Sequence, residues 1–230
     1  MSETVSVMLF VAFPYVAIAL AIAVSALRWR LAPFTVSSLS SQLLESKKLF
    51  WGSIPFHWGI VLILTGHIFT LFLPSTVSWW GGEPLRLYAV EFTGVALGLW
   101  TLFGLGVLLY RRLTNAKIRV VTTPMDFVVI IVLLVQVISG LAVAIALRWG
   151  LLWAPGVVVP YIWSLVTLSP RPELISSFSV ILQVHVLSFW VFLAIFPFTR
   201  LVHFITFPVM YLTRPWQRVV RMRDVERIGQ

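Results

Sequence analysis

Residues 56–69 read FHWGIVLILTGHIF, an apolar stretch that contains two histidines, His57 and His67. The stretch belongs to a longer apolar run, about 52–74, which can cross a hydrocarbon core of roughly 30 Å as a helix. An ionisable side chain inside a membrane is costly, so its presence there points to a function. The stretch therefore predicts a membrane-spanning helix and a functional site on that helix.

The whole chain has the composition of a membrane protein. Of its 230 residues, 60% are hydrophobic and only 11% are charged, whereas soluble domains carry about 25% charged residues. We predict an all-α integral membrane protein, with residues 1–230 forming one domain of five transmembrane helices. The fifth apolar run is longer than a bilayer needs, and Pro197 predicts a bend near its end. The predicted spans are about 5–27, 52–74, 88–110, 125–147 and 177–205.

The lysine and arginine residues predict the orientation of these helices. Of 17 such residues, only Arg86, Arg148 and Arg171 fall in the second and fourth connections. Because positive residues accumulate on the cytoplasmic side, the N-terminus is predicted to lie outside and the C-terminus in the cytoplasm. Residues 206–230 would then form a basic cytoplasmic tail on a multi-pass protein of the cytoplasmic membrane. Charges beside span ends favour membrane lipid as a partner and not nucleic acid, which the net charge of +9 alone would suggest.

A further apolar stretch, residues 149–169, allows two interpretations. As a sixth span, it would place the arginine-rich tail outside the cell. As a segment lying in the outer interface, it would be anchored by Trp149, Trp153 and Trp163, since tryptophan favours this region. We favour the interfacial segment, because the stretch contains Pro155, Gly156 and Pro160 and because a sixth span conflicts with the charge distribution.

All four histidines of the chain fall in two predicted helices, His57 and His67 in the second, His185 and His203 in the fifth. At 1.5 Å per residue, the first two are about 15 Å apart along their helix and the second two about 27 Å apart. Because the two helices run in opposite directions, His67 and His185 lie at a similar depth in the membrane, and His57 lies close in depth to His203. We therefore pair His67 with His185 and His57 with His203. On a continuous helix, His185 and His203 would share one face, whereas His57 and His67 point about 80° apart.

Two histidine pairs at different depths predict two haem groups. Zinc prefers a closed tetrahedral ligand set, and neither pair has a third ligand nearby. Two axial imidazoles fill both free positions of haem iron and favour electron transfer. The chain has no cysteine, which excludes cysteine-ligated clusters and covalent c-type haem within it, so both haems would be b-type. For any single histidine, a hydrogen bond to a neighbouring helix remains the alternative.

Other polar and small residues near the spans are candidates for the same sites. Arg111, Arg112 and Arg200 would neutralise haem propionates, or serve only as positive anchors on the inner side. Arg86 would meet a quinone carbonyl or an outer propionate, or only solvent. Asp126 follows a Thr-Thr-Pro sequence that is typical of a helix start. Glycines in the spans would admit either a flat macrocycle or close helix packing, and they are Gly59, Gly66, Gly104 and Gly140.

Four stretches of the chain resemble the gamma subunit of respiratory nitrate reductase, the cytochrome b membrane anchor. The resemblance extends over nearly the whole chain and implies five helices with an external N-terminus. It implies an outer haem held by His67 and His185, and an inner haem held by His57 and His203. The stretches that carry it are SSQLLESKK (40–48), FHWGIVLILTGH (56–67), RVVTTPMD (119–126) and FPFTRLVHFITFPVMYLTR (196–214).

The resemblance also implies a function. The family oxidises a membrane quinol, menaquinol or ubiquinol, near the outer haem. Electrons then pass through the two haems to a cytoplasmic iron–sulfur subunit and on to a molybdenum catalytic subunit, which reduces nitrate. Gly66, His67 and Arg86 would form the quinol site, with arginine at 86 where the family pattern has lysine. This chain would be the electron-transfer subunit of the enzyme complex, without a nitrate-reducing centre of its own.

Two alternatives to this function remain open from the sequence. The first is an equivalent cytochrome b subunit of another quinone-linked oxidoreductase. The second is a haem-free transporter or assembly factor that uses its histidines as proton relays.

Overall fold

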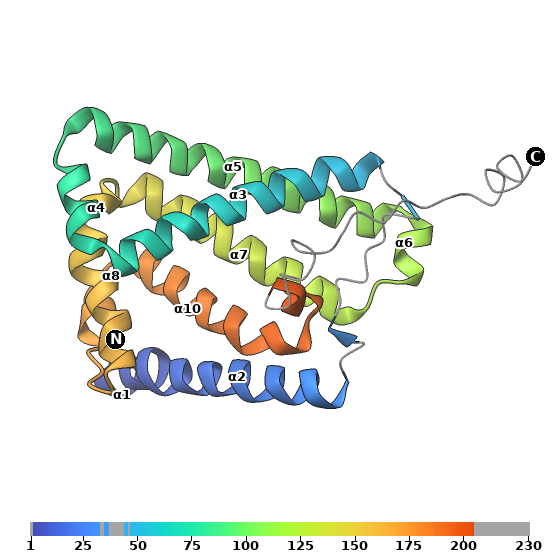
Figure 1. Cartoon of the computed structure of the whole chain (residues 1–230), viewed down its shortest axis with the longest axis horizontal. Coiled ribbons are helices and arrows are strands. Elements are labelled where there is room, and N and C mark those ends of the chain that lie inside the picture. Colours follow the sequence, from blue (N-terminus) through green and yellow to red (C-terminus); the bar gives the residue numbers. More distant parts are fainter. Residues whose placement is uncertain (1, 33–34, 37–43, 46, 205–230) are drawn as a thin grey trace, which may run out of the picture.

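A computed structural model describes residues 2–32, 35–36, 44–45 and 47–204, and every regular element in these ranges is a helix. Five stretches are long and apolar enough to span a membrane, which confirms the predicted all-α fold with five spans. Figure 1 shows them running along the long axis of the molecule. The predicted tail, 206–230, lies outside the described residues. The spans are Glu3–Leu31 (α1 Glu3–Val7, a π-helical turn Met8–Ala12 and α2 Phe13–Leu31), α3 Lys47–Phe72, α5 Pro84–Thr114, α7 Pro124–Ala146, and Val180–Phe198, which begins with α10.

The surfaces of the spans are apolar in the way that lipid contact requires. Large side chains such as Phe92, Ile131 and Ile138 are more than half exposed. A contiguous exposed apolar surface of this kind marks a membrane-facing region. Two buried clusters hold the helices together, one around Tyr161 and Trp190 and the other between α3, α5 and α7.

Short helices connect the spans, and the apolar stretch predicted at an interface is one of them. α8 has 17 residues, fewer than any of the five spans, and it lies across the ends of the spans in Figure 1. Its Trp163 indole donates a hydrogen bond to the carbonyl of Leu71, 3.2 Å away near the end of α3. This arrangement matches an interfacial segment and not a sixth span. The connecting helices are α4 Pro74–Gly81, α6 Ala116–Val120, α8 Gly150–Val166 and α9 Glu173–Ser176.

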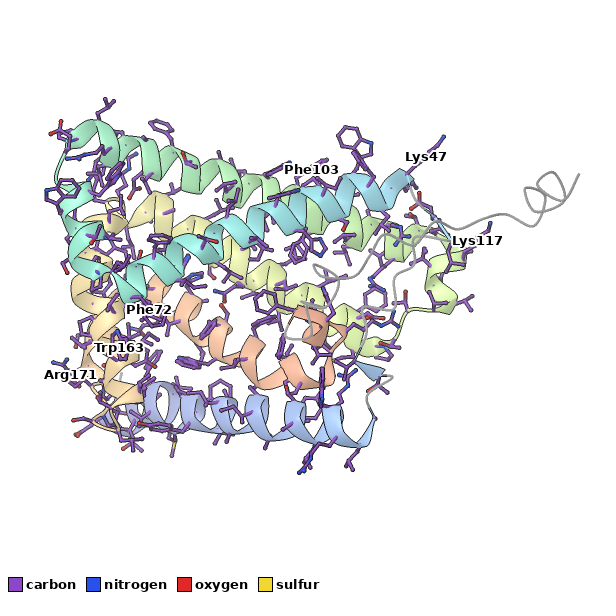
Figure 2. The ribbon with its side chains drawn as sticks, viewed as in Figure 1. Lys47, Phe72, Phe103, Lys117, Trp163 and Arg171 are labelled. Atoms are coloured by element: carbon purple, nitrogen blue, oxygen red, sulfur yellow. The ribbon has the colours of Figure 1, made fainter. Side chains whose placement is uncertain are left out.

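The two ends of the bundle differ in charge. Lys47 and Lys117 lie at one end, which we call the basic end, and Trp163 and Arg171 lie at the opposite end, the α8 end (Figure 2). The end of α2, the start of α3, the end of α5 and the start of α7 all meet at the basic end (Figure 1). The connections that the sequence assigns to the cytoplasmic side therefore share one end of the molecule.

The fifth span departs from its predicted form. One bent helix was expected over 177–205, but α10 covers only Val180–Ile195. It is followed by two 3-10 turns, Phe196–Phe198 and Arg200–Phe204, separated by extended backbone at Thr199. Proline has no N–H and its ring clashes with the preceding turn, so Pro197 breaks the helix. The expectation that His185 and His203 share one face of a continuous helix is therefore wrong.

A buried tyrosine compensates for a proline in the first span. Pro14 follows the π-helical turn and has no N–H, so it leaves the preceding turn, which includes the carbonyl of Phe10, one donor short. Tyr161 donates its hydroxyl proton to this carbonyl at 2.9 Å, and the Trp190 indole donates to the Tyr161 hydroxyl at 3.2 Å. Tyr161 is fully buried. The first span is therefore fixed against α8 and α10 where its own hydrogen bonding is interrupted.

Glycines allow α3 and α5 to cross closely. A Cβ atom at Gly104 would lie 2.6 Å from the backbone nitrogen of Phe56, and one at Gly59 would lie 2.1 Å from the Thr101 hydroxyl. Such contacts are too short for any residue with a side chain. For these two glycines, the structure supports helix packing. The crossing fixes α3, the helix that carries two of the four histidines.

Candidate functional site

The four histidines lie in two pairs. The ring centroids of His67 and His185 are 6.4 Å apart, and those of His57 and His203 are 6.5 Å apart. α3 supplies one histidine to each pair, α10 supplies His185, and the 3-10 turn Arg200–Phe204 supplies His203. The structure thus brings together the same histidines that we paired by their predicted depth along the helices.

The spacing within each pair suits two imidazoles on opposite sides of one metal ion. A metal–imidazole bond of about 2 Å places the two ligating nitrogens about 4 Å apart and the ring centres about 6 Å apart. Among the described residues, no group of three or more histidine, cysteine, aspartate or glutamate side chains could hold a metal. Haem iron brings its remaining ligands with it, so two imidazoles are sufficient to hold it.

Three of the histidines are oriented by carbonyl groups of their own segments. In each, the ring Nδ1 lies within hydrogen-bond distance of a backbone oxygen three or four residues earlier. A carbonyl can only accept, so Nδ1 carries the proton and Nε2 keeps its lone pair for a metal. The contacts are His57 with Ser53 at 2.7 Å, His67 with Ile63 at 2.8 Å and His203 with Arg200 at 2.8 Å.

His185 has different surroundings, made by side chains of α7. Its Nδ1 lies 3.1 Å from the Ser139 hydroxyl and 3.3 Å from the Gln136 amide nitrogen. A Cβ atom at Gly140 would lie 2.9 Å from Cε1 of this ring. Gly140 therefore provides the space that the imidazole occupies against α7.

Arg111 is 2% exposed and pairs with a carboxylate of the protein. Its Nε donates to the Glu45 carboxylate at 2.6 Å, and its Nη2 donates to the Glu45 carbonyl at 2.8 Å. The same carboxylate accepts from the backbone N–H of Lys48 at 2.7 Å, at the start of α3. Burial opposes ionisation of Glu45, but these hydrogen bonds and the Arg111 charge hold the pKa of Glu45 below its ordinary value.

Arg112 and Arg200 share a second carboxylate, that of Asp126. Arg112 Nη1 lies 3.4 Å and Arg200 Nε 3.2 Å from its two oxygens. Asp126 also accepts from the Thr123 backbone N–H at 2.9 Å in a capping box, as expected for a helix start. The arginines predicted to bind propionates thus have carboxylate partners within the protein.

Arg28, which the sequence marks only as a positive anchor, fixes the segment that carries His203. Its Nη1 donates to the carbonyls of Pro197 and Thr199, at 2.8 Å each. These carbonyls lie where the fifth span breaks, on either side of Phe198. The sequence contains one signal for this role. Arg28 lies at the inner end of the first span, and Pro197 breaks the fifth span at a similar predicted depth.

The residues expected to bind quinol are not joined by contacts in the structure. Gly66 is exposed, and a Cβ atom there would meet nothing within 4 Å, so no side chain of the described residues covers α3 at Gly66, next to His67. The Arg86 guanidinium instead lies over Trp79 and Trp80, 4.9 and 5.1 Å from their ring centres. In the part of the chain that the structure describes, its Nε is buried without a hydrogen-bond partner.

Comparison with known proteins identifies the family. A family model of the nitrate reductase gamma subunit matches residues 6–223. The chain belongs to this family. It is 31% identical over 207 residues to the nitrate reductase gamma chain of Bacillus subtilis, which covers 88% of this chain and 92% of that protein. Identity is also 31% over 231 residues with the respiratory nitrate reductase 2 gamma chain of Escherichia coli, covering 97% of this chain and all of that protein.

A third relative matches with only part of its length. The nitrate reductase-like protein NarX of Mycobacterium tuberculosis is 34% identical over 212 residues, which cover 88% of this chain but 32% of that protein. The family and the five apolar helices together identify a multi-pass membrane subunit of a nitrate reductase.

Proposed function

We propose that this chain holds two b-type haems and passes electrons from membrane quinol to the cytoplasmic subunits of a nitrate reductase. The observation that carries the proposal is the pairing of all four histidines at 6.4 and 6.5 Å between α3 and the fifth span. When bound, a haem with two axial imidazoles supplies one-electron transfer and offers no free position for O₂.

The residues of the chain have separate tasks in this proposal. His67 and His185 hold the outer haem, and His57 and His203 hold the inner one. The protonated Nδ1 of three of these rings turns Nε2 toward the metal. Arg112 and Arg200 are half-buried, so they can share their charge between Asp126 and a haem propionate. Arg111 is the least accessible of the three, and we assign it mainly to Glu45.

The proposed orientation places the α8 end outside and the basic end in the cytoplasm. Quinol would be oxidised beside Gly66 and His67, on the side of α3 that protein side chains leave uncovered, with Arg86 supplying positive charge at the same end. Releasing protons outside while electrons move inward is worth about 2.3 kcal/mol per charge per 100 mV. The quinol is menaquinol or ubiquinol.

The proposed partners bind at the basic end. Lys47 and Lys117 are exposed there, and so is Arg119, which lies on α6 together with Lys117. The relatives are named gamma chains, which supports a complex with other subunits. We expect an iron–sulfur subunit and a molybdenum subunit on this face, with anionic lipid headgroups around its rim.

A reduced-minus-oxidised absorption spectrum of the purified complex tests the proposal. Two b-type components are expected. His67→Ala and His185→Ala should lose the same component, whereas His57→Ala and His203→Ala should lose the other. Thr93→Ala is the control, because its hydroxyl bonds only the Ala89 carbonyl of its own helix. A wild-type complex without b-type absorbance would overturn the proposal and favour a haem-free transporter.

A further inference from the structure

Among the described residues, the Nδ1 of His185 contacts side chains of another helix, those of Ser139 and Gln136 on α7. His57, His67 and His203 each have a carbonyl from their own segment as the nearest acceptor. For His185, that role falls to the Ser139 hydroxyl on α7. The difference matters for a metal ligand, because the hydrogen bond on the second ring nitrogen sets the tautomer and basicity of the imidazole.

The direction of the Ser139 hydrogen bond follows from its other contact. The hydroxyl lies 3.1 Å from the backbone carbonyl of Gln136 and donates its single proton to that carbonyl. Its oxygen can then only accept at His185 Nδ1. This acceptance selects the tautomer with the proton on Nδ1 and leaves the Nε2 lone pair for a metal.

The side chain of Gln136 supports the ring from the same helix. The Ser188 hydroxyl, one turn from His185 on α10, hydrogen-bonds the Gln136 amide oxygen. The amide nitrogen then lies 3.3 and 3.4 Å from the two ring nitrogens. As a donor it can bond only the unprotonated Nε2, and a metal bound at Nε2 would replace that contact. Ser139 and Ser188 are both buried, so these contacts form away from water, and with Gly140 they define one position for the imidazole.

We propose that Ser139 is a positioning residue that sets the reduction potential of the iron held between His67 and His185. The inference rests on the proposed function. A hydroxyl oxygen is a weaker acceptor than a peptide carbonyl, so it makes His185 less basic than its partner His67. Removing this acceptor lowers the basicity of His185 further, which destabilises the oxidised iron and raises the potential.

Potentiometric titration of the purified complex, followed at each b-type component, tests the inference. Ser139→Ala should shift the redox equilibrium of the His67–His185 component about tenfold toward the reduced form, about 59 mV for one electron. The reduction potential of the His57–His203 component should not change. Ser53→Ala is the matched variant, because its hydroxyl lies 3.1 Å from His57 Nδ1 but the Ser53 carbonyl lies closer at 2.7 Å. In Ser53→Ala, the reduction potential of the His57–His203 component should shift much less than that of the His67–His185 component does in Ser139→Ala.

The outcomes separate this inference from the proposed function. A wild-type complex without two b-type components would overturn the proposed function itself. Two components with unchanged potentials in Ser139→Ala, or equal shifts of both, would overturn only the role of Ser139. If Ser139→Ala loses the component, Ser139→Thr decides, since threonine keeps the hydroxyl. Full haem content and the wild-type potential in Ser139→Thr would support the inference, and loss of the component there would contradict it.

Discussion

The two histidine pairs have the same spacing but are supported in different ways. His185 lies on a regular helix and is positioned by a glycine and two uncharged side chains of α7. His203 lies on a 3-10 turn whose segment is held by Arg28 and by the ion pair of Arg200 with Asp126. Charged side chains are costly in the hydrocarbon region and tolerated near the headgroups. The depth of each pair therefore explains which kind of support it uses.

The largest effects are expected when both pairs are broken. The double variant His67→Ala/His185→Ala should lose no more b-type absorbance than either single variant, because both changes remove one site. His67→Ala/His203→Ala should lose both components. Difference spectra of the purified complex at equal protein concentration measure this. Loss of both b-type components in His67→Ala/His185→Ala would show that the two sites depend on each other. The two pairs could then not be treated as separately supported sites.

The next largest effect is a steric one that is expected at the His67–His185 pair and not at the His57–His203 pair. Gly140→Ala places a methyl group 2.9 Å from the His185 ring, so the ring must move. We expect at least a tenfold loss of haem affinity at the His67–His185 site, in the range typical of changed supporting contacts. The His57–His203 component should stay, and haem titration of the apoprotein measures both affinities. Gly156→Ala is the control, since a Cβ there meets nothing within 4 Å, and a loss of that size in the control would contradict the steric reason.

Much of this arrangement could be predicted from the sequence, because spans and depths follow from local quantities. Apolar run length predicted the five spans, and the 1.5 Å rise per residue predicted the partners of His57 and His67. Hydropathy could not predict the end of α10 at Ile195, since the apolar run continues to Phe198. On α3, His57 and His67 point about 80° apart, whereas a continuous fifth helix would have placed His185 and His203 on one face. The break after Ile195 removes this conflict, because His203 lies on a separate 3-10 turn.

The supporting contacts were beyond sequence reasoning for a different reason. Arg28 contacts residues about 170 positions later in the chain, and Ser139 contacts His185 across two helices. Such pairings depend on how the helices pack, and no local pattern records them. Serine is common in spans as a packing residue, so Ser139 carried no signal of its own.

A charge change at the basic end should affect the other pair. Asp126→Asn removes the carboxylate shared by Arg112 and Arg200 while keeping a side chain that can cap α7. Because both arginines are half-buried, losing their charged partner should cost about 2 kcal/mol, the value for hydrogen bonds to charged groups. We expect the His57–His203 component to bind haem more weakly. Thermal unfolding in detergent and haem titration measure these effects. Equal weakening of both components would show that Asp126 supports the whole bundle and not one pair.

The smallest expected effect concerns Glu45, which caps the start of α3 and pairs with Arg111. Because the folded-state pKa of Glu45 is lowered, its contribution is complete above its ordinary pKa of 4.5 and is lost as the pH falls through the lowered value. Glu45→Gln should cost about 1 kcal/mol at pH 7, the difference between a charged and a neutral hydrogen bond. Thermal midpoints measured from pH 7 to pH 3 should converge for the two proteins in acid, because the wild-type protein then loses the Glu45 charge as well. A constant difference between the midpoints at all pH values would show that the Glu45 charge does not stabilise the start of α3.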